Sequence, residues 1–593
     1  MMTRTMSKYS IRARMSAAIL ALAFCVAAAG RGSAEDLSPA AETVGPAAPI
    51  SGTLFVCGGG KVPEAALAKF IELAGGQNAY IVVVTTASET ADTAAVESRL
   101  EFWKSKPLAE MSILHTRSKE VADDPKFCEP LMRATGLWFI GGHQERIIDA
   151  YLGTRAEKAM KGILRRGGVV GGTSAGAAIM SPVMIVRADG AQPITGPGFG
   201  FLPGTIVDQH FLKRQRERRL LTVLNSYPKL VGLGIDENSV LMVQGRTMTV
   251  ISDPKDAKDP KEAKVMSYLA PVGARSVVSK TYFENDEFDL LALSRSAIAR
   301  VEPRYSFDDA TIDPEVSRGT LIVSGGGEVP DEVAEQFIEA AGGPDAAIVV
   351  VTTANGERLS PEAKQVAWLA AAGAKDIHLV HPRTRTDTEA PALLALLKKA
   401  GGVWFTGGRQ WRLVDAFQDS PAEKEFHDVL ARGGVIGGSA GGASMLADYL
   451  VRGGPLSNKE ITAEGYEEGF GFLKGVAIDP FFTQRNRFAD MAALKRARPH
   501  LVGLGVDEGT ALIVSGRNFE IVGSNQVVVY DSHEGEQAEK GFKFLYEGDK
   551  YNLATRERLG PPRANAEPQV VARAEPAEDD DPEPQPPIAC ESE

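Results

Sequence analysis

The stretch that decides the fold is Gly171-Gly172-Thr173-Ser174-Ala175-Gly176-Ala177. It follows the apolar run 167–170 (GGVV), typical of a buried strand, and leads into 177–180 (AAIM), which can begin a helix. Residues 172–176 fit G-x-S-x-G, a sharp strand–turn–helix elbow that lifts a serine hydroxyl out of the backbone. We expect glycine at both ends because a Cβ there would crowd the neighbouring strand. The motif alone is weak evidence, so a nucleophilic Ser174 needs partners.

A serine nucleophile requires a base, and the residues before the middle of the chain offer three histidines. His115 ends an apolar run and is most simply a strand-end residue. His143 lies in the turn Gly-Gly-His-Gln, where a binding role is as plausible as a catalytic one. His210 ends the strand-like run 207–211 (VDQHF) and precedes five cations within seven residues, which is unusual in an acidic protein. His210 is therefore the leading base.

The base in turn needs an orienting carboxylate. Glu237 follows the apolar run 232–235 (GLGI), and a residue at the carboxyl end of a strand in a parallel sheet points into the ligand crevice. Glu237 is the leading candidate and Asp236 is its competitor. Spacing alone does not choose between them.

The chain before these motifs alternates strands and helices. Residues 52–60 (GTLFVCGGG) predict a strand that runs into a glycine turn, residues 61–74 an amphipathic helix, and residues 80–84 (YIVVV) a second buried strand. This spacing indicates an α/β fold with a mostly parallel sheet flanked by helices on both faces.

The same sequence motifs recur later in the chain. Residues 319–327 (GTLIVSGGG) repeat 52–60, residues 403–410 (VWFTGGRQ) repeat 137–144 (LWFIGGHQ), and residues 503–508 (GLGVDE) repeat 232–237 (GLGIDE). The offsets of 267, 266 and 271 residues drift only slightly. The sequence therefore predicts two tandem α/β domains that arose by duplication.

Composition places limits on the class of protein. The first residues combine four cations with an apolar run from 15 to 29 and a small-residue site at 32–34, which predicts a secretory signal peptide. We therefore expect a secreted or periplasmic protein without a membrane span. The net charge of −12 makes nucleic acid an unsuitable partner. Cys57, Cys128 and Cys590 remain after cleavage, without spacing typical of a disulfide framework or a zinc site, so we expect no metal and no cofactor.

These observations predict the domain limits. Residues 1–34 form the signal peptide, 35–50 a linker, 51–315 a catalytic domain, 316–558 a second, inactive copy, and 559–593 a disordered acidic, Pro-rich tail.

A family resemblance adds to these patterns. Four motifs in the same order, Gly-Gly-x-Gln, Gly-Thr-Ser-Ala-Gly-Ala, Asp-Gln-His-Phe followed by spaced arginines, and Gly-Ile-Asp-Glu, resemble those of the cyanophycinase family. That family belongs to the serine peptidases that also include aspartyl dipeptidase (peptidase E), on a fold like that of class I glutamine amidotransferases. The resemblance covers about 190 residues of the first domain. It implies a Ser-His-Glu triad that falls on Ser174, His210 and Glu237.

The resemblance also implies a substrate. It predicts hydrolysis of a β-linked aspartyl-arginine polymer to dipeptides, each with a carboxylate that an arginine can bind bidentately and a guanidinium that Asp or Gln can accept. The implied oxyanion donors are Gly141 or Gly142 together with Ala175. The implied substrate-binding residues are Gln144, Asp208, Gln209, Arg214, Arg216 and Arg219. The alternatives are an isoaspartyl dipeptidase without polymer preference and a secreted, non-catalytic binding protein.

The second copy departs from the pattern. Alignment without gaps from Gln410 places Ala440 opposite Ser174, although a slip of one residue would place Ser439 at the elbow. Phe481 stands where His210 stood, 27 residues before Glu508, and it cannot accept a proton. We expect a single active site per chain and a pseudo-dimer of the two domains within one chain, with a large, apolar interface.

Overall fold

The structure is a computed structural model that describes residues 46–189, 192–252, 264–303, 313–455, 457–531 and 541–561. The predicted signal peptide, most of the predicted linker and nearly all of the acidic tail lie outside the described residues. The domain limits therefore stay predictions at both ends of the chain. We use the term first half for residues 46–303 and second half for residues 313–561.

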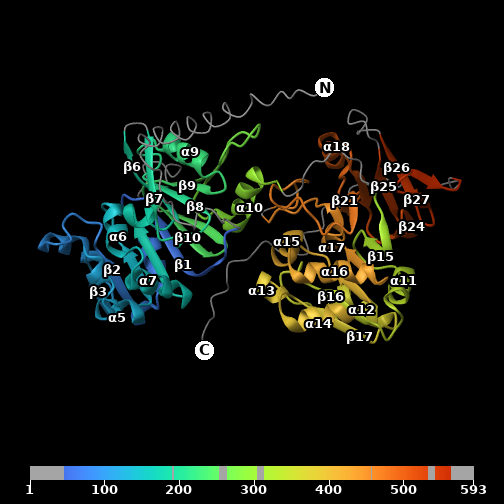
Figure 1. Cartoon of the computed structure of the whole chain (residues 1–593), viewed down its shortest axis with the longest axis horizontal. Helices are drawn as coiled ribbons and strands as arrows, with labels where there is room; N and C mark the ends of the chain where they lie inside the picture. The colour runs from blue at the N-terminus through green and yellow to red at the C-terminus, as the bar shows by residue number, and fades with distance from the viewer. Residues whose placement is uncertain are drawn as a thin grey trace, which may run out of the picture.

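Both halves have the same α/β architecture and stand side by side (Figure 1). The strands of the first half are β1 Ile50–Cys57, β2 Tyr80–Val84, β3 Glu110–Leu114, β4 Gly136–Phe139, β5 Val169–Thr173, β6 Val183–Asp189, β7 Gln192–Pro197, β8 Thr205–Gln209, β9 Val231–Ile235, β10 Ser239–Gly245, β11 Thr247–Ser252, β12 Val265–Leu269, β13 Val278–Tyr282 and β14 Glu287–Asp289. Its α-helices are α2 Glu64–Leu73, α3 Glu101–Lys104, α4 Lys119–Ala122, α5 Pro125–Arg133, α6 Gln144–Tyr151, α7 Arg155–Arg165, α8 Ala175–Ala178, α9 Glu217–Ser226 and α10 Leu290–Val301.

The large sheet of the first half has the strand order β14-β11-β10-β1-β5-β4-β2-β3. The five strands from β1 to β3 in this order pair in parallel, whereas β10, β11 and β14 are antiparallel. A smaller sheet has the order β13-β12-β9-β8, in which β8 and β9 are parallel. The predicted mostly parallel sheet is therefore confirmed, with an antiparallel edge that the motifs did not predict.

The sheet is apolar on both faces because helices cover both. Along β1, Leu54 and Val56 belong to the core under α5, α6 and α7, whereas Phe55 and Cys57 belong to the core under α2 and α3. Side chains alternate between the faces of a strand, so a strand buried on both faces must be an unbroken apolar run. Each fully buried Val, Leu, Ile or Phe contributes about 1.5–3 kcal/mol to folding.

The second half repeats this plan. Its strands are β15 Val316–Ser324, β16 Ala347–Val351, β17 Asp376–Val380, β18 Gly402–Phe405, β19 Val435–Ser439, β20 Ala447–Tyr449, β21 Leu473–Pro480, β22 Val502–Val506, β23 Thr510–Gly516, β24 Asn518–Gly523, β25 Gln526–Tyr530, β26 Phe542–Tyr546, β27 Lys550–Asn552 and β28 Glu557–Leu559. Its helices are α11 Asp331–Ala341, α12 Lys364–Ala371, α13 Arg385–Thr388, α14 Pro391–Lys399, α15 Gln410–Phe417, α16 Pro421–Ala431, α17 Gly441–Ser444 and α18 Phe488–Ala497.

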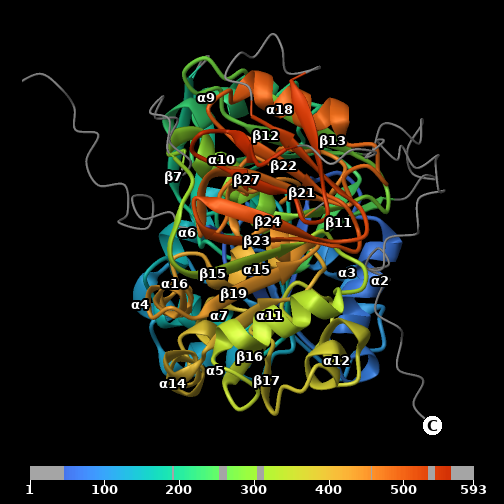
Figure 2. The same ribbon diagram turned by 90° about the vertical axis from the view of Figure 1, so that its right-hand side faces the viewer.

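The large sheet of the second half has the order β17-β16-β18-β19-β15-β23-β24-β27-β28, beside a smaller sheet β20-β21-β22-β25-β26. Figure 2 shows α11 and α12 in front of the lower part of this half, with the smaller sheet and α18 above. The core again divides in two, because Ile322 packs with α11 and α12 while Leu321 and Val323 pack with α14, α15 and α16.

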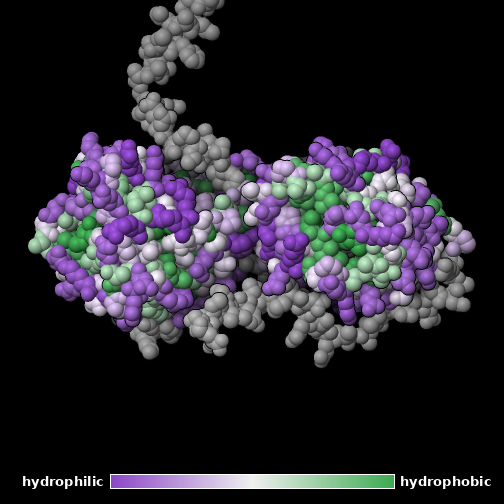
Figure 3. All heavy atoms as spheres, turned by 90° about the horizontal axis from the view of Figure 1, so that it is seen from below, coloured by the Kyte–Doolittle hydropathy of each residue, from purple (hydrophilic) through white to green (hydrophobic). Residues whose placement is uncertain are grey.

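Ion pairs join the two halves, and the extent of an apolar interface stays a prediction. Asp415 of the second half forms ion pairs with Arg246 and Arg295 of the first half, at 2.5 and 2.9 Å. Glu464 forms ion pairs with Arg275 and Arg300, at 2.8 and 3.0 Å. Figure 3 shows the two halves as two lobes that meet side by side, with hydrophilic residues on both lobes beside the boundary. Apolar contact contributes as well, because Ala292 of α10 packs in the core of the second half.

No helix in the described ranges has the length and apolar character needed to cross a membrane.

Candidate active site

Ser174 occupies the turn between β5 and α8. Its backbone angles, φ 55° and ψ −108°, lie outside the helix and strand regions, as expected for a strained elbow. The N–H of Ser174 donates to the carbonyl of Cys57 at the end of the adjacent β1, at 3.0 Å. This bond fixes the turn against the sheet and holds the hydroxyl at the carboxyl edge of the parallel strands.

The two glycines of the motif are required by close packing. A Cβ on Gly172 would lie 2.7 Å from the backbone of Gly176, and a Cβ on Gly176 would lie 2.5 Å from the carbonyl oxygen of Phe139. The expected collision with a neighbouring strand is correct for Gly176, whereas a Cβ on Gly172 would meet the start of α8. The helix after the turn, α8, has only four residues, so its dipole contributes little at this place.

The hydroxyl of Ser174 lies next to an imidazole and a carboxylate. His210 Nε2 is 2.9 Å from Ser174 Oγ, and His210 Nδ1 is 2.6 Å from Glu237 Oε1. The three side chains thus form one hydrogen-bonded chain, although they are well separated in the sequence. With Nδ1–H donating to Glu237, Nε2 is left as an acceptor for the serine proton.

The structure distinguishes Glu237 from its competitor. Asp236 Oδ1 accepts the N–H groups of Leu212 and Lys213, both at 3.0 Å. It therefore secures the loop after His210 and does not contact the imidazole. The two carboxylates differ because adjacent residues at the end of β9 point in opposite directions.

His210 itself sits in an unusual backbone conformation at the end of β8, with φ 49°. Its N–H donates to the carbonyl of Gly58 at 2.7 Å. Its ring lies over Gly59, where a Cβ would come within 2.2 to 2.7 Å of three ring atoms. Gly59 (φ 112°) was not among the predicted site residues, although the repeated Gly-Gly-Gly at 58–60 and 325–327 was a signal for it.

The surroundings of His210 lower its pKa. Burial of the ring has the largest effect and favours the neutral form, while the hydrogen bond to Glu237 raises the pKa and the charge of Arg214 lowers it. The net pKa lies below the ordinary value for histidine. A neutral imidazole is the form that can accept a proton from Ser174.

The predicted oxyanion donors lie around the serine. Ala175 is the next residue in the chain and is fully buried at the start of α8. Gly141, in the turn between β4 and α6, approaches so closely that a Cβ there would lie 3.3 Å from Ser174 Cβ and 3.9 Å from Oγ. Gly142 is the next residue, backed by the carbonyl of Ala87.

Two of the predicted arginines are held by the predicted aspartate. Asp208 is fully buried and accepts hydrogen bonds from two arginines. Arg219 donates through Nε at 2.9 Å and through Nη2, and Arg216 donates through Nη1 at 3.4 Å. Arg216 also donates to the carbonyl of Gln209 at 2.6 Å. Asp208 therefore orients two guanidinium groups beside the triad, which differs from its predicted role of accepting a ligand guanidinium. Because one carboxylate is shared by two guanidinium groups, this part of the site has a net positive charge.

The remaining predicted binding residues have different surroundings. The amide of Gln144 donates to the carbonyls of Ile185 and Val186 at 3.0 and 2.6 Å, so it anchors β6. Gln209 is buried and its Oε1 has no hydrogen-bond partner among the residues the structure describes. Arg214 is exposed.

The second half has the same backbone at this place with different side chains. Ala440 has φ 51° and donates its N–H to Ser324, as Ser174 does to Cys57. Phe481 has φ 51° and donates its N–H to Gly325, as His210 does to Gly58. Ser439 pairs in register with Ser324, as Thr173 does with Cys57, so the alignment without a slip is the correct one.

Comparison with known families agrees with this duplication. The model of peptidase family S51 matches residues 54–251 and again residues 320–522. The cyanophycinase of Geminocystis herdmanii is 26% identical over 262 residues, which cover 41% of this chain and 96% of that protein. The cyanophycinase of Synechococcus elongatus is 31% identical over 216 residues, 34% of this chain and 66% of that protein.

Similar solved structures include a peptidase from an acI-B1 actinobacterium, with a TM-score of 0.33 and 22% identity over 40% of this chain and 97% of that one. A putative peptidase E protein from Listeria monocytogenes matches with a TM-score of 0.27 and 12% identity, over 35% of this chain and 100% of that one. The two matches to the family model together span more than half of the sequence. The chain is a serine-type peptidase that belongs to peptidase family S51 and carries two copies of its domain in tandem.

Proposed function

We propose that the first half hydrolyses cyanophycin, the aspartyl-arginine polymer, at the bonds between its units, and releases β-Asp-Arg dipeptides. The observation that carries this proposal is the hydrogen-bonded chain from Ser174 through His210 to Glu237, beside an arginine cluster. The curated relatives named cyanophycinase support the choice of polymer.

The geometry supports acyl transfer in two steps. Ser174 Oγ attacks the carbonyl carbon while His210 Nε2 accepts the hydroxyl proton, and the imidazolium then protonates the leaving amine. Water hydrolyses the acyl-enzyme by the same route in reverse. N–H groups of Ala175 and of Gly141 or Gly142 would stabilise the negative oxygen of each tetrahedral intermediate.

The charge balance favours a substrate that carries carboxylates. Arg216 and Arg219 share the single carboxylate of Asp208, and the exposed Arg214 adds a further positive charge. A free carboxylate in each Asp-Arg unit would be bound by such a cluster through charge-assisted hydrogen bonds. The positive charge therefore favours peptides with a free carboxylate in every unit over peptides of neutral residues.

The test is incubation of the purified chain with insoluble cyanophycin and, separately, with β-Asp-X dipeptides. We expect release of β-Asp-Arg from the polymer, abolished by Ser174→Ala. Turnover of dipeptides without turnover of polymer would establish the alternative, an isoaspartyl dipeptidase. If neither is cleaved, both proposals are wrong and a non-catalytic binding protein is the better description.

We also propose that the chain is exported and that residues 1–34 are removed. The support is the charge and hydropathy pattern of that segment alone. Expression in a Gram-negative host followed by N-terminal sequencing should find a mature chain in the periplasm or medium that begins near Glu35. An unprocessed chain that starts at Met1 would contradict this.

A further inference from the structure

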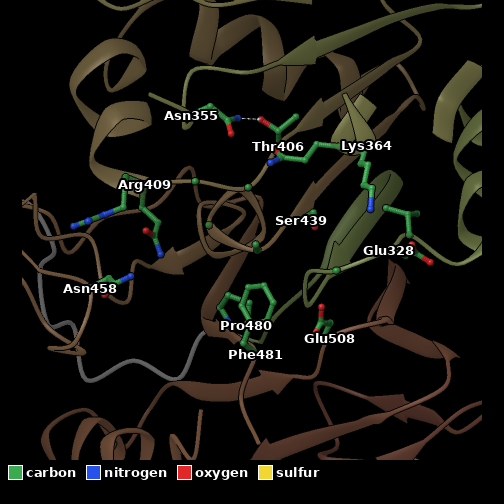
Figure 4. Close-up of a pocket in the computed structure, with 18 of the residues that line it drawn as sticks. Glu328, Asn355, Lys364, Thr406, Arg409, Ser439, Asn458, Pro480, Phe481 and Glu508 are labelled. Atoms are coloured by element: carbon green, nitrogen blue, oxygen red, sulfur yellow. Dashed lines mark hydrogen bonds between the residues drawn. The ribbon is translucent and has the colours of Figure 1, made fainter. Parts of the chain in front are cut away.

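The second half retains a cavity of about 870 Å³ at the place that corresponds to the active site. Ala440, Phe481 and Glu508, the counterparts of the triad, all line it. Figure 4 shows Ser439 near its centre, Glu508 and Phe481 on one side, Lys364 and Glu328 at one end, and Arg409 and Asn458 at the other. Loss of the nucleophile and base has therefore not closed the pocket.

This cavity has kept no means of acyl transfer. A methyl group replaces the hydroxyl at position 440, and the phenyl ring of Phe481 replaces the imidazole. The phenyl ring instead holds Arg485, whose guanidinium lies 4.7 Å from the ring centroid. Arg485 is exposed and lines the cavity.

The positive charges of the cavity are of two kinds. Arg487 and Arg452 are buried and bound to Asp479, and Arg452 also binds Asp490 at 2.7 Å. Their charges are thus balanced within the protein. Arg485, Arg409 and Lys364 also line the cavity, where Arg485 lies over the Phe481 ring and Arg409 donates to the carbonyl of Gly454 at 3.0 Å.

Two carboxylates, those of Glu508 and Glu328, distinguish this cavity from the active site of the first half. Replacement of histidine by Phe481 leaves the exposed Glu508 carboxylate without a hydrogen-bond or ion-pair partner among the described residues. At the other end of the cavity Glu328 stands where the first half has Lys61, 267 positions earlier. A pocket that only bound anions would gain nothing from either carboxylate, whereas both suit a guanidinium.

We propose that this cavity is a second, non-hydrolysing binding site for peptides that carry both carboxylate and guanidinium groups. Glu508 binds the guanidinium, and Arg485, which the Phe481 ring holds, binds carboxylate together with Lys364 or Arg409. The identification of the ligand as the β-Asp-Arg unit rests on the function proposed for the first half. The second half then holds the polymer while the first half cleaves it, which raises the local concentration of substrate.

The experiment uses the full chain with Ser174→Ala, so that no ligand is consumed, and β-Asp-Arg dipeptide as the probe in isothermal titration calorimetry. We expect two dipeptides per chain. Glu508→Gln or Arg485→Ala in that background should weaken one of them by about tenfold or more, because each loses a charged hydrogen-bond partner. Arg214→Ala, the matched change in the first half, should weaken only the other.

A second probe, β-Asp-Ala, lacks the guanidinium, so its binding to the second site should not depend on Glu508. Glu508 and Arg485 are both exposed, and unchanged thermal unfolding of each variant excludes misfolding as the cause. One dipeptide per chain, unaffected by Glu508→Gln and Arg485→Ala, would overturn the inference even where wild-type chain degrades cyanophycin. Dipeptide binding that depends on Glu508, in a chain that does not degrade cyanophycin, would support the second site and reject the function proposed for the first.

Discussion

His210 links the nucleophile to the carboxylate, since it contacts both Ser174 and Glu237. Its ring is mostly buried, with 10% of the side chain exposed, and it must be neutral before it can accept a proton. The protein meets this requirement by burial, which lowers the pKa of His210, while Glu237 fixes the tautomer. The hydroxyl, the base and the carboxylate therefore act as one unit.

Substitutions at the triad should reflect this unity. We expect Ser174→Ala and His210→Ala each to reduce kcat by about 10³-fold or more, and the double variant to add little. Glu237→Gln should reduce kcat less, but still substantially, since the geometry survives while the charge is lost. Steady-state kinetics on cyanophycin measures these effects. Asp236→Asn is the comparison, and a larger loss there than in Glu237→Gln would contradict the assignment of the carboxylate.

The pH dependence is set by the same residue. Activity requires neutral His210, so kcat/KM should be present above its pKa and lost as the pH falls through it. Because that pKa is lowered, the acid limb should have its midpoint below about pH 6.5. Arg214→Ala removes a positive charge that lowers the pKa, so it should move the acid limb to higher pH. Lys375→Ala, an exposed site in the second half, should not move it, and an unshifted limb in Arg214→Ala would contradict this role of the charge.

At the scale of elements, the site depends on two strand ends that meet. β1 ends at Cys57 and turns through glycines, while β8 ends at Gln209 and turns through His210. The second half repeats this contact, with the Phe481 ring over Gly326, where a Cβ would lie 2.3 Å from Cζ. The two turns therefore have the same backbone. The first lies under the catalytic ring of His210, and the second lies under the ring of Phe481.

Because the two turns have the same backbone, Gly326→Ala can serve as the control for Gly59→Ala. Gly59→Ala should displace the His210 ring, because an added Cβ would lie 2.2 to 2.7 Å from three ring atoms and φ is 112°. We expect both a fall in kcat and a lower melting temperature. Gly326→Ala has the same strain, with φ 111°, and should lower the melting temperature without loss of kcat. Calorimetry and kinetics on both variants separate the effects, and equal losses of kcat would show that the ring contact is not the cause.

The sequence predicted the parts of this fold that depend on local pattern. The strand expected at 52–60 is β1 Ile50–Cys57, and the helix expected at 61–74 is α2 Glu64–Leu73, because runs of buried apolar residues and helical periodicity are visible in the chain itself. The repeated motifs also identified Ala440 and Phe481 as replacements.

Other features could not be predicted because they depend on residues far apart. The contact of Gly59 with His210 joins positions 151 residues apart, and spacing could not tell Glu237 from Asp236. The use of Asp208 to hold Arg216 and Arg219 depends on the path of the loop after β8. The polar junction is built from single arginines and carboxylates that no motif marks.

For the whole molecule, the junction is the feature that decides how the halves cooperate. Arg246 in the first half binds Asp289 of its own half and Asp415 of the other, both at 2.5 Å, and lies 4.4 Å over the Trp411 ring. The two carboxylates are nearly buried, with 13% and 8% of their side chains exposed. Burial raises the pKa of Asp289 and Arg246 acts against that rise, so the carboxylate needs its cation to stay charged.

Removal of that cation should therefore be costly. We expect Arg246→Ala to lower the free energy of unfolding by about 3–5 kcal/mol, since it leaves buried carboxylates with one partner fewer. Lys375→Ala breaks an exposed pair with Asp345 and should cost about 0–1 kcal/mol. Urea unfolding of both variants gives the comparison. Equal, small effects would mean that the halves are only tethered by the chain between them.

The central claim is that the chain has one working serine, Ser174, and that the second half binds without cleaving. The most direct measurement is the number of covalent adducts formed by a fluorophosphonate, counted by intact-mass spectrometry and located by peptide mapping. We expect one adduct per chain, on Ser174, lost in Ser174→Ala and in His210→Ala and unchanged in Ser439→Ala. Two adducts per chain, or a single adduct on Ser439, would contradict the claim.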